Sequence, residues 1–526
     1  MNKIYKKSSL PLIYHPVLFA VFPVLSLFVH NIDQSSLLDI ILPVAVVLGM
    51  TVLLFLVFLL FFQNKQKSGL LTSLLMIISL SYGHLYRQLL DWRIGEVVLG
   101  RHRYLLGACL LLVLLVIILV LRRRKPLDNI TRSLNFISVV LILIAAGNAL
   151  FFLFGEVQAP AKSTGDWGEV ITRSEDPDQL RDIYYIVFDR YAGADTLRDV
   201  YGYDNRDFLE YLIGKGFYVA GQSRANYVNT TQSLGSSLNL RYINDFAARA
   251  DKKSRNWRLY YPLLENHEVQ RFLKGKGYRY LHFGGLNDTT RNNRFADENY
   301  NLINMSDLSL MLYQNSILPF LPGVGKLFSH RRQQWLRIKY QFRELALVAR
   351  RPEPTFTLAH FILPHPPFVF DQDGGFVTER EAARRGKIEN YRNQLIYCNR
   401  EIRKLVETIL DDSAIIPVII IQGDEGPWPR RYEKNCQAFD WREAAPAEFR
   451  EKFSILNAYY LPAEYDPGFY PSITPVNSFR LIFNALFNTN LPTLPDKSYA
   501  VIDAGHPFLM IEVTDRIEGR DRAIRP

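Results

Sequence analysis

The first 154 residues contain five long apolar segments, near residues 10–30, 37–62, 70–86, 104–121 and 134–154. A helix needs roughly 20 apolar residues to cross a bilayer, and the second, fourth and fifth segments approach or exceed that length. The third segment is the least apolar, because Tyr82, Gly83 and His84 lie at its end. We therefore expect residues 1–155 to form a membrane domain of about five transmembrane helices.

The first apolar segment follows three lysines, as the apolar part of a signal peptide would. It lacks a small-residue cleavage site and another apolar run follows closely, so we expect a retained helix. Basic residues recur on alternate sides of the segments, at residues 3–7, 65–67 and 122–125, although residues 87–103 are basic too. Because cytoplasmic loops are enriched in lysine and arginine, this pattern predicts a multi-pass protein of the bacterial cytoplasmic membrane. Its N-terminus would be cytoplasmic, and the residues after 154 would be periplasmic or extracellular.

The formal charge of +10 is spread along the chain and lies largely beside the apolar segments. This distribution argues against nucleic acid as a partner and favours the bilayer. Of the three cysteines, Cys109 lies within an apolar segment, while Cys398 and Cys436 fall in the exported part. These two residues could form a disulfide or remain free thiols, and their spacing does not indicate metal binding.

Strand-like and helix-like segments alternate after a polar linker, which we place at residues 156–181. Apolar strands are predicted at DIYYIVFD (182–189), GFYVAG (216–221), TFTLAHFIL (355–363) and PVIIIQ (417–422). Helices are predicted between them, for example at residues 206–214 and 391–410. Such alternation predicts an α/β domain over residues 182–517, with a mostly parallel sheet covered by helices on both faces. Residues 518–526 would form a charged tail.

Two of the predicted strands run directly into acidic residues. The first ends at Asp189, and the second is followed by Asp424 and Glu425. Parallel strands deliver such residues to their carboxyl edge, where α/β proteins place ligands, so we expect a metal site there. The hydroxyl-rich stretch NYVNTTQSLGSS (226–237) lies between them in sequence and could supply a nucleophile.

The order of these elements resembles the alkaline phosphatase superfamily, specifically its sulfatases, lipoteichoic acid synthases and lipid A phosphoethanolamine transferases. The resemblance covers residues 180–490. It matches Asp189 to the family's first acidic ligand and Thr230, followed by Ser233, to its nucleophile. The HPPF segment beginning at His365 looks like the family's His-x-Pro-aromatic element, and Asp424-Glu425-Gly426 stands where the family has Asp-His-Gly. Membrane helices before an exported domain are similar to the two transferase families.

The resemblance implies an enzyme that uses one divalent metal to cleave or transfer a phosphate ester, or less readily a sulfate ester. The metal would be held by Asp189, Thr230, Asp424 and Glu425. Thr230, with Thr231 as an alternative, would be the nucleophile, because a metal can activate a weakly acidic hydroxyl. His365 would act beside it. Substrate contacts would come from His360, Arg190, Asn229 and Trp428, although Arg190 and Trp428 could equally be structural.

Glu425 is the main departure from the family pattern, because a carboxylate replaces an imidazole. The resulting ligands are all oxygen, which favours Mg²⁺, Mn²⁺ or Ca²⁺ over Zn²⁺. The same substitution is also compatible with a site that has lost its activity. His506, in DAGHPFLM, is interpreted as structural.

Three function classes compete. The leading hypothesis is a membrane-anchored hydrolase or transferase acting on an envelope lipid or glycan. Residues 230–234 lack the Cys/Ser-x-Pro-x-Arg pattern of sulfatases, which favours phosphate chemistry. A catalytically silent envelope protein with the same fold is the alternative. A transporter is disfavoured, because few ionisable residues lie within the apolar segments.

Overall fold

The protein is represented by a computed structural model, which describes most of the chain. The described residues are 11–32, 37–89, 92–94, 97–98, 101–155, 180–252, 254–285, 288–302, 306–321, 329–503 and 505–519. The predicted linker and tail, and the lysines at residues 3–7, lie almost entirely outside this set. All three cysteines are within it, and all are free thiols, so no disulfide joins Cys398 to Cys436.

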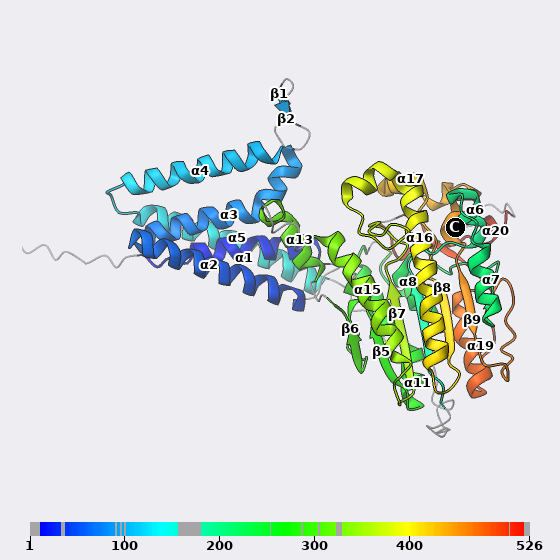
Figure 1. Cartoon of the computed structure of the whole chain (residues 1–526). Helices are drawn as coiled ribbons and strands as arrows, with labels where there is room; N and C mark the ends of the chain where they lie inside the picture. Colours follow the sequence, from blue (N-terminus) through cyan, green and yellow to red (C-terminus); the bar gives the residue numbers. More distant parts are fainter. Residues whose placement is uncertain are drawn as a thin grey trace, which may run out of the picture. The chain divides into compact units, whose positions relative to one another are not determined.

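The chain divides into two compact units (Figure 1). The first comprises Met1–Glu156 together with Met305–His330, and the second comprises Val157–Asn304 together with Arg331–Pro526. The boundary near residue 156 lies where the apolar segments end. Residues 305–330, however, group with the first unit, whereas the sequence placed them in the α/β domain.

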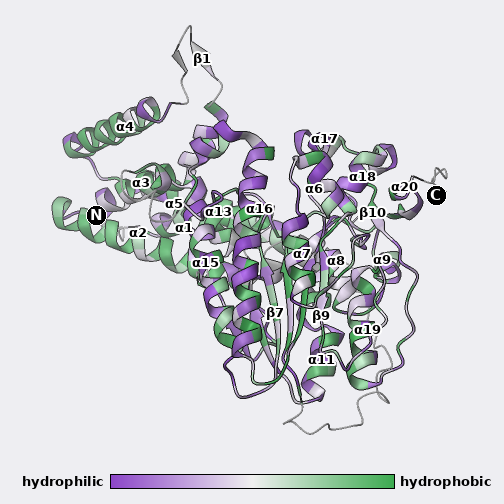
Figure 2. Ribbon diagram, turned by 45° about the vertical axis from the view of Figure 1, so that its right-hand side comes forward, coloured by the Kyte–Doolittle hydropathy of each residue, from purple (hydrophilic) through white to green (hydrophobic). Residues whose placement is uncertain are grey.

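The first unit is built from apolar helices. They are α1 (His15–His30), α2 (Ile41–Phe62), α3 (Lys65–Leu89), α4 (His102–Arg122) and α5 (Asp128–Gly155), with the short η1 (Leu37–Ile40), β1 (Arg93–Ile94) and β2 (Val97–Val98). In the described part of the chain, four helices are long and apolar enough to cross a membrane. The fifth expected span, α1, is shorter, with 16 residues. Figure 2 shows that α2 and α4 are hydrophobic along most of their lengths.

Helix α13 (Asp307–Asn315) packs within this apolar unit although it comes from far along the chain. The Ile317 amide donates to the Ser79 carbonyl of α3 at 2.7 Å. Arg87 of α3 donates to the Asn315 side chain. Gly83 permits this close approach, because a Cβ at that position would lie 2.6 Å from the carbonyl oxygen of Gln314.

The second unit contains a seven-stranded sheet in the order β4-β9-β8-β3-β7-β5-β6. The strands are β3 (Ile183–Phe188), β4 (Tyr218–Val219), β5 (Arg279–Phe283), β6 (Glu298–Tyr300), β7 (Thr355–Phe361), β8 (Val418–Gly423) and β9 (Asn457–Tyr460). Neighbours from β6 to β8 are parallel, and β9 runs antiparallel to both β8 and β4. The predicted mostly parallel sheet is therefore confirmed.

Helices cover both faces of this sheet, which explains why its central strands are apolar without alternation. On one face, Ile186 of β3 belongs to a core shared with α15 (His330–Val348) and α16 (Glu379–Asp412). On the other, Tyr185 belongs to a core shared with three further helices. These are α8 (Thr230–Ser237), α11 (Glu268–Gly275) and α19 (Pro475–Phe487). Figure 1 shows α15 and α16 lying along the strands.

We predict that Gly83→Ala destabilises the protein, because the new Cβ would overlap the backbone of Gln314 and Asn315. Gly107→Ala is the matched control, since a Cβ on this other helical glycine meets no atom within 4 Å. Alanine is about 1 kcal/mol more favourable than glycine in a helix, so the control should be neutral or slightly stabilising. Thermal unfolding of the purified protein in detergent measures both. Equal melting temperatures for the two variants would contradict the packing of α13.

Candidate active site

The site begins where β3 and β8 end side by side. Phe188 of β3 pairs with Gly423 of β8, so the residues that follow, Asp189 and Asp424, emerge at the same sheet edge. The Asp189 amide donates to the Phe361 carbonyl of β7 at 2.9 Å, which fixes the third neighbouring strand beside them. The parallel register thus brings together two acids that are far apart in sequence.

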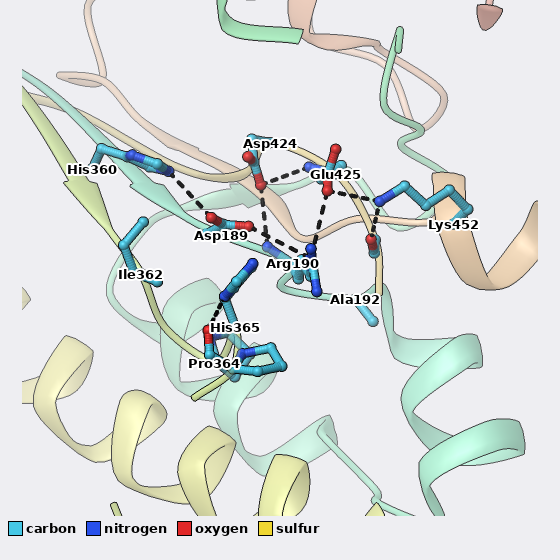
Figure 3. A network of polar contacts seen from close by, with 12 residues as sticks. Asp189, Arg190, Ala192, His360, Ile362, Pro364, His365, Asp424, Glu425 and Lys452 are labelled. Atoms are coloured by element: carbon cyan, nitrogen blue, oxygen red, sulfur yellow. Dashed lines mark hydrogen bonds and ion pairs between the residues drawn. The ribbon is translucent and has the colours of Figure 1, made fainter. Parts of the chain in front are cut away.

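His360 of β7 completes a buried cluster with these two acids (Figure 3). Potential ligand atoms of Asp189, His360 and Asp424 all lie within 4.8 Å of one another. Each residue is at most 2% exposed. His360 was predicted as a substrate contact, and the structure instead places its imidazole with the two carboxylates. Sequence reasoning did not identify it as a ligand, because it lies inside the strand rather than after its end.

Several polar atoms of this cluster have no hydrogen-bond partner. These are Asp189 Oδ1, Asp424 Oδ2 and His360 Nε2. The other oxygen of Asp424, Oδ1, accepts from the amides of Arg190 at 3.1 Å and Glu425 at 2.8 Å, which fixes the carboxylate. Buried polar atoms are normally paired. Three residues that each carry an unpartnered buried atom, and whose potential ligand atoms lie within 4.8 Å of one another, therefore fit a cation.

The local electrostatics favour the same conclusion. Burial, and then the neighbouring Asp424 carboxylate, raise the pKa of Asp189 well above its usual range. Burial lowers the pKa of His360, so its ring is neutral and carries a lone pair. A cation would relieve the repulsion between the carboxylates and bind the neutral imidazole.

Glu425, a predicted metal ligand, is engaged by a cation of the protein itself. The Lys452 ammonium donates to Glu425 Oε1 at 2.7 Å and to the Gly426 carbonyl at 2.9 Å. Lys452, from α18 (Pro446–Phe453), is fully buried. Burial raises the pKa of Glu425 to about 7 and lowers that of Lys452 to about 8. Sequence reasoning did not identify Lys452, because a single lysine in a charged helix carries no recognisable pattern.

Arg190 and Trp428 form one wall beside Glu425. The Arg190 backbone is left-handed, with φ of 63°, and its Nε lies 3.6 Å from Glu425 Oε1. Its guanidinium carbon is 5.6 Å from the centre of a Trp428 ring, and Trp428 stacks on Tyr432 at 4.0 Å. Both predicted substrate contacts therefore lie next to the acidic cluster.

The hydroxyl-rich segment is connected to the cluster through Ser233. Thr230 is the first residue of α8, and Asn229 precedes it. Ser233, one turn later, donates from Oγ to the Asp424 carbonyl at 2.6 Å. This bond holds the first turn of α8 beside the second acid. Asn229, Thr230 and Thr231 are only half-buried, so their side chains remain accessible.

His365 lies next to Asp189, since its amide donates to the Asp189 carbonyl at 3.2 Å. Its Nδ1 pairs with the Pro366 carbonyl, which leaves Nε2 as the ring atom facing away from that carbonyl. Burial, and then the nearby Arg190, lower the pKa of His365 well below its usual range. The ring is therefore neutral, with its proton on Nδ1 and a lone pair on Nε2.

Comparison with known proteins gives structural likenesses only. No family model and no curated protein matches the sequence. The C-terminal periplasmic domain of EcEptC from Escherichia coli is similar over 65% of this chain and 94% of its own, with 12% identity and a TM-score of 0.42. The integral membrane protein lipooligosaccharide phosphoethanolamine transferase A from Neisseria meningitidis is similar over 89% of this chain and 95% of its own, with 12% identity and a TM-score of 0.39.

A further similar structure, Ps i-CgsB in complex with k-i-k-neocarrahexaose, covers 61% of this chain and 80% of its own, with 14% identity and a TM-score of 0.40. Likenesses at these identities concern the fold alone.

We predict that Lys452→Met destabilises the second unit by about 3–5 kcal/mol, because it removes the cation that is hydrogen-bonded to the buried Glu425 carboxylate and leaves only Arg190 nearby. The double variant Glu425→Gln, Lys452→Met should recover most of that loss, since it removes both charges. Urea unfolding followed by tryptophan fluorescence measures the difference. If the double variant is no more stable than the single one, the pair does not account for the burial of Glu425.

Proposed function

We propose that this chain is a membrane-anchored, metal-dependent hydrolase or transferase of phosphate esters that acts through a covalent intermediate on Thr230. The observation that carries the proposal is the buried cluster of Asp189, His360 and Asp424, each with an unpartnered polar atom, beside the hydroxyl-bearing start of α8. Buried, unpartnered ligands next to an accessible hydroxyl fit a metal-activated nucleophile.

We propose one divalent ion, held by Asp189, His360 and Asp424, with the Thr230 hydroxyl as a further ligand. When bound, such an ion lowers the pKa of the hydroxyl and neutralises charge on the attacked ester. The preference for Mg²⁺, Mn²⁺ or Ca²⁺ over Zn²⁺ rested on Glu425 as a ligand in an all-oxygen set. With Glu425 paired to Lys452 and an imidazole in the set, both Mn²⁺ and Zn²⁺ suit the donors.

The remaining residues have roles that follow from their positions. The amides in the first turn of α8 and the guanidinium of Arg190 would bind the equatorial oxygens of the ester. The lone pair on His365 Nε2 would accept the proton of Thr230. Trp428 and Asn229 would contact the group attached to phosphorus. Glu425 would keep Lys452 and Arg190 in place rather than bind the metal.

Membrane anchoring indicates the substrate class. Four long apolar helices hold the α/β unit at the membrane, which favours an envelope lipid or glycan as the substrate. With the N-terminus in the cytoplasm and the shorter α1 as a fifth crossing, the α/β unit would act on the periplasmic side. Phosphate is favoured over sulfate, because the segment that starts α8 has a threonine and no cysteine.

Substitution of Thr230 tests the nucleophile. We expect Thr230→Ala to lower the turnover of bis(4-nitrophenyl) phosphate and 4-nitrophenyl phosphate by about 1,000-fold or more, because the covalent step is lost. Thr231→Ala is the matched control and should keep most of the activity. Release of 4-nitrophenol by the detergent-purified protein, with Mn²⁺ or Zn²⁺ added, measures both. Equal turnover by wild type and Thr230→Ala would refute the assignment.

Metal content tests the ligand set independently of activity. We expect His360→Gln to lower the bound metal to a small fraction of one equivalent, because it removes the only nitrogen ligand proposed. Glu425→Gln should retain close to one equivalent. Elemental analysis of the dialysed proteins measures both. Loss of metal from Glu425→Gln but not from His360→Gln would restore the ligand set predicted from the sequence.

A catalytically silent binding or assembly module remains the second candidate. Lys452 favours it, because its ammonium already neutralises one of the acidic residues at this sheet edge without a metal. Absence of bound divalent ion from the wild-type protein at millimolar Mn²⁺, Zn²⁺, Mg²⁺ and Ca²⁺ would select this candidate.

A further inference from the structure

A histidine–aspartate pair lies in the loop between β10 (Tyr499–Val501) and β11 (Met510–Glu512). His506 Nδ1 is 2.8 Å and 2.9 Å from the two carboxylate oxygens of Asp503. The Gly505 amide also donates to Asp503 at 2.8 Å, which holds the carboxylate under the ring. The His506 side chain is 39% exposed.

The arrangement is that of an imidazole oriented for proton transfer. A carboxylate on Nδ1 fixes the orientation of the ring and leaves Nε2 as the second ring nitrogen. The α/β unit has four other histidines among the described residues. His267, His282 and His360 are buried, and His365 pairs with a carbonyl. His506 is the one of these five held by a carboxylate within hydrogen-bond distance.

One side of this loop is attached to the start of α8. The Gln232 side chain donates to the Pro507 carbonyl at 3.0 Å, and the Tyr260 hydroxyl donates to the same oxygen at 2.8 Å. Gln232 is fully buried and lies two residues after Thr230. The residue next to His506 is therefore fixed to the helical turn that carries the proposed nucleophile.

The other side of the loop is attached to Trp441, an aromatic residue whose ring packs near that of Trp428. The Trp441 amide donates to the Ile502 carbonyl at 3.0 Å, and Trp441 lies 6.2 Å from Trp428 between ring centres. Burial raises the pKa of Tyr432 to about 12, and the carboxylates of Glu425 and Asp503 both contribute to this shift. The Tyr432 ring lies 4.0 Å from that of Trp428 and 6.4 Å from that of Trp441, so one aromatic cluster joins the attachment point of the loop to Trp428.

We propose that His506 is a catalytic residue that transfers a proton to the leaving group and from the acceptor, with Asp503 as its positioning residue. The inference rests on the proposed function. The loop is attached to the start of α8 and to Trp441, which packs beside Trp428 and Tyr432, so both of its attachments are to elements that border the site. His365 would then accept and return the proton of the Thr230 nucleophile. His506 would protonate the leaving group and accept the proton of the acceptor.

The proposed reaction has two steps, and in each one phosphorus–oxygen bond forms while another breaks. Thr230 Oγ bonds to phosphorus while the bond from phosphorus to the leaving oxygen breaks. The leaving oxygen takes a proton from His506 Nε2, and the Thr230 proton passes to His365. In the second step, water or an alcohol bonds to phosphorus while the bond from phosphorus to Thr230 Oγ breaks. The acceptor's proton returns to His506, and Thr230 regains its own from His365.

The dependence of rate on the leaving group tests this role. The probes are a series of aryl methyl phosphodiesters whose leaving groups run from 4-nitrophenol to phenol, assayed with wild type, His506→Gln and Thr230→Ala. A leaving group that is already acidic needs no proton. The second step is common to all the esters, so the rate compared is that of phenol release in the first turnover. We therefore expect His506→Gln to change this rate by less than about 3-fold for the 4-nitrophenyl ester and to lower it by about 100-fold for the phenyl ester. Asp503→Asn should shift the series in the same direction by less, with the ring still present.

Each alternative outcome has a distinct meaning. An equal loss across the series, or no loss, in a His506→Gln protein that unfolds at the wild-type temperature would overturn the role of His506. If Thr230→Ala abolishes turnover at the same time, the proposed function stands without it. If the wild type turns over none of the esters with any metal, both proposals fall. Should His506→Gln fail to fold, Asp503→Asn decides the question by the same change in leaving-group dependence.

Discussion

The structure depends on burying like charges at one edge of a parallel sheet. Asp189, Asp424 and Glu425 are all at most 2% exposed, and like charges in so dry a place repel strongly. Lys452 and Arg190, which lie against Glu425, offset part of this repulsion. Asp189 and Asp424 share a neutral imidazole and have partly unpaired oxygens, and Arg190 reaches Asp189 only at 4.0 Å. The positive charge of the protein is therefore unevenly distributed. Glu425 is paired with a cation of the protein itself, whereas the position between Asp189 and Asp424 can accept an added cation.

Much of the fold could be predicted because its signals are local. The strands that became β3, β7 and β8 are continuous apolar runs, and their burial on both faces requires such sequences. The apolar helices were equally visible, although α1 is shorter than a full span. The place of α13 was not predictable in this way. Its contacts with α3 depend on Gly83 and on residues more than 200 positions away, and no local pattern records such a contact.

The site was predictable where strand ends define it and less so elsewhere. Asp189 and Asp424 follow apolar strands, so the sheet register alone brings them together. His360 lies one residue before the end of β7, and alternation along the strand decides which face its ring takes. Lys452 comes from a helix later in the chain and meets Glu425 only through tertiary packing. The proximity of Thr230 to the acids rests on Ser233, whose three-residue spacing was visible in the sequence, although its hydrogen-bond partner was not.

The division of residues between the two units determines how a soluble α/β fragment can be made. The chain passes between the units at residues 156–157, 304–305 and 330–331, so the α/β unit is joined to the apolar helices by three covalent crossings. A recombinant fragment that starts after residue 156 would keep α13 but lose its neighbours. Leu308 and Leu312, buried in the intact chain, would then face water. Such a fragment would tend to self-associate, and excising residues 305–330 with a short replacement loop is the rational route to a soluble domain.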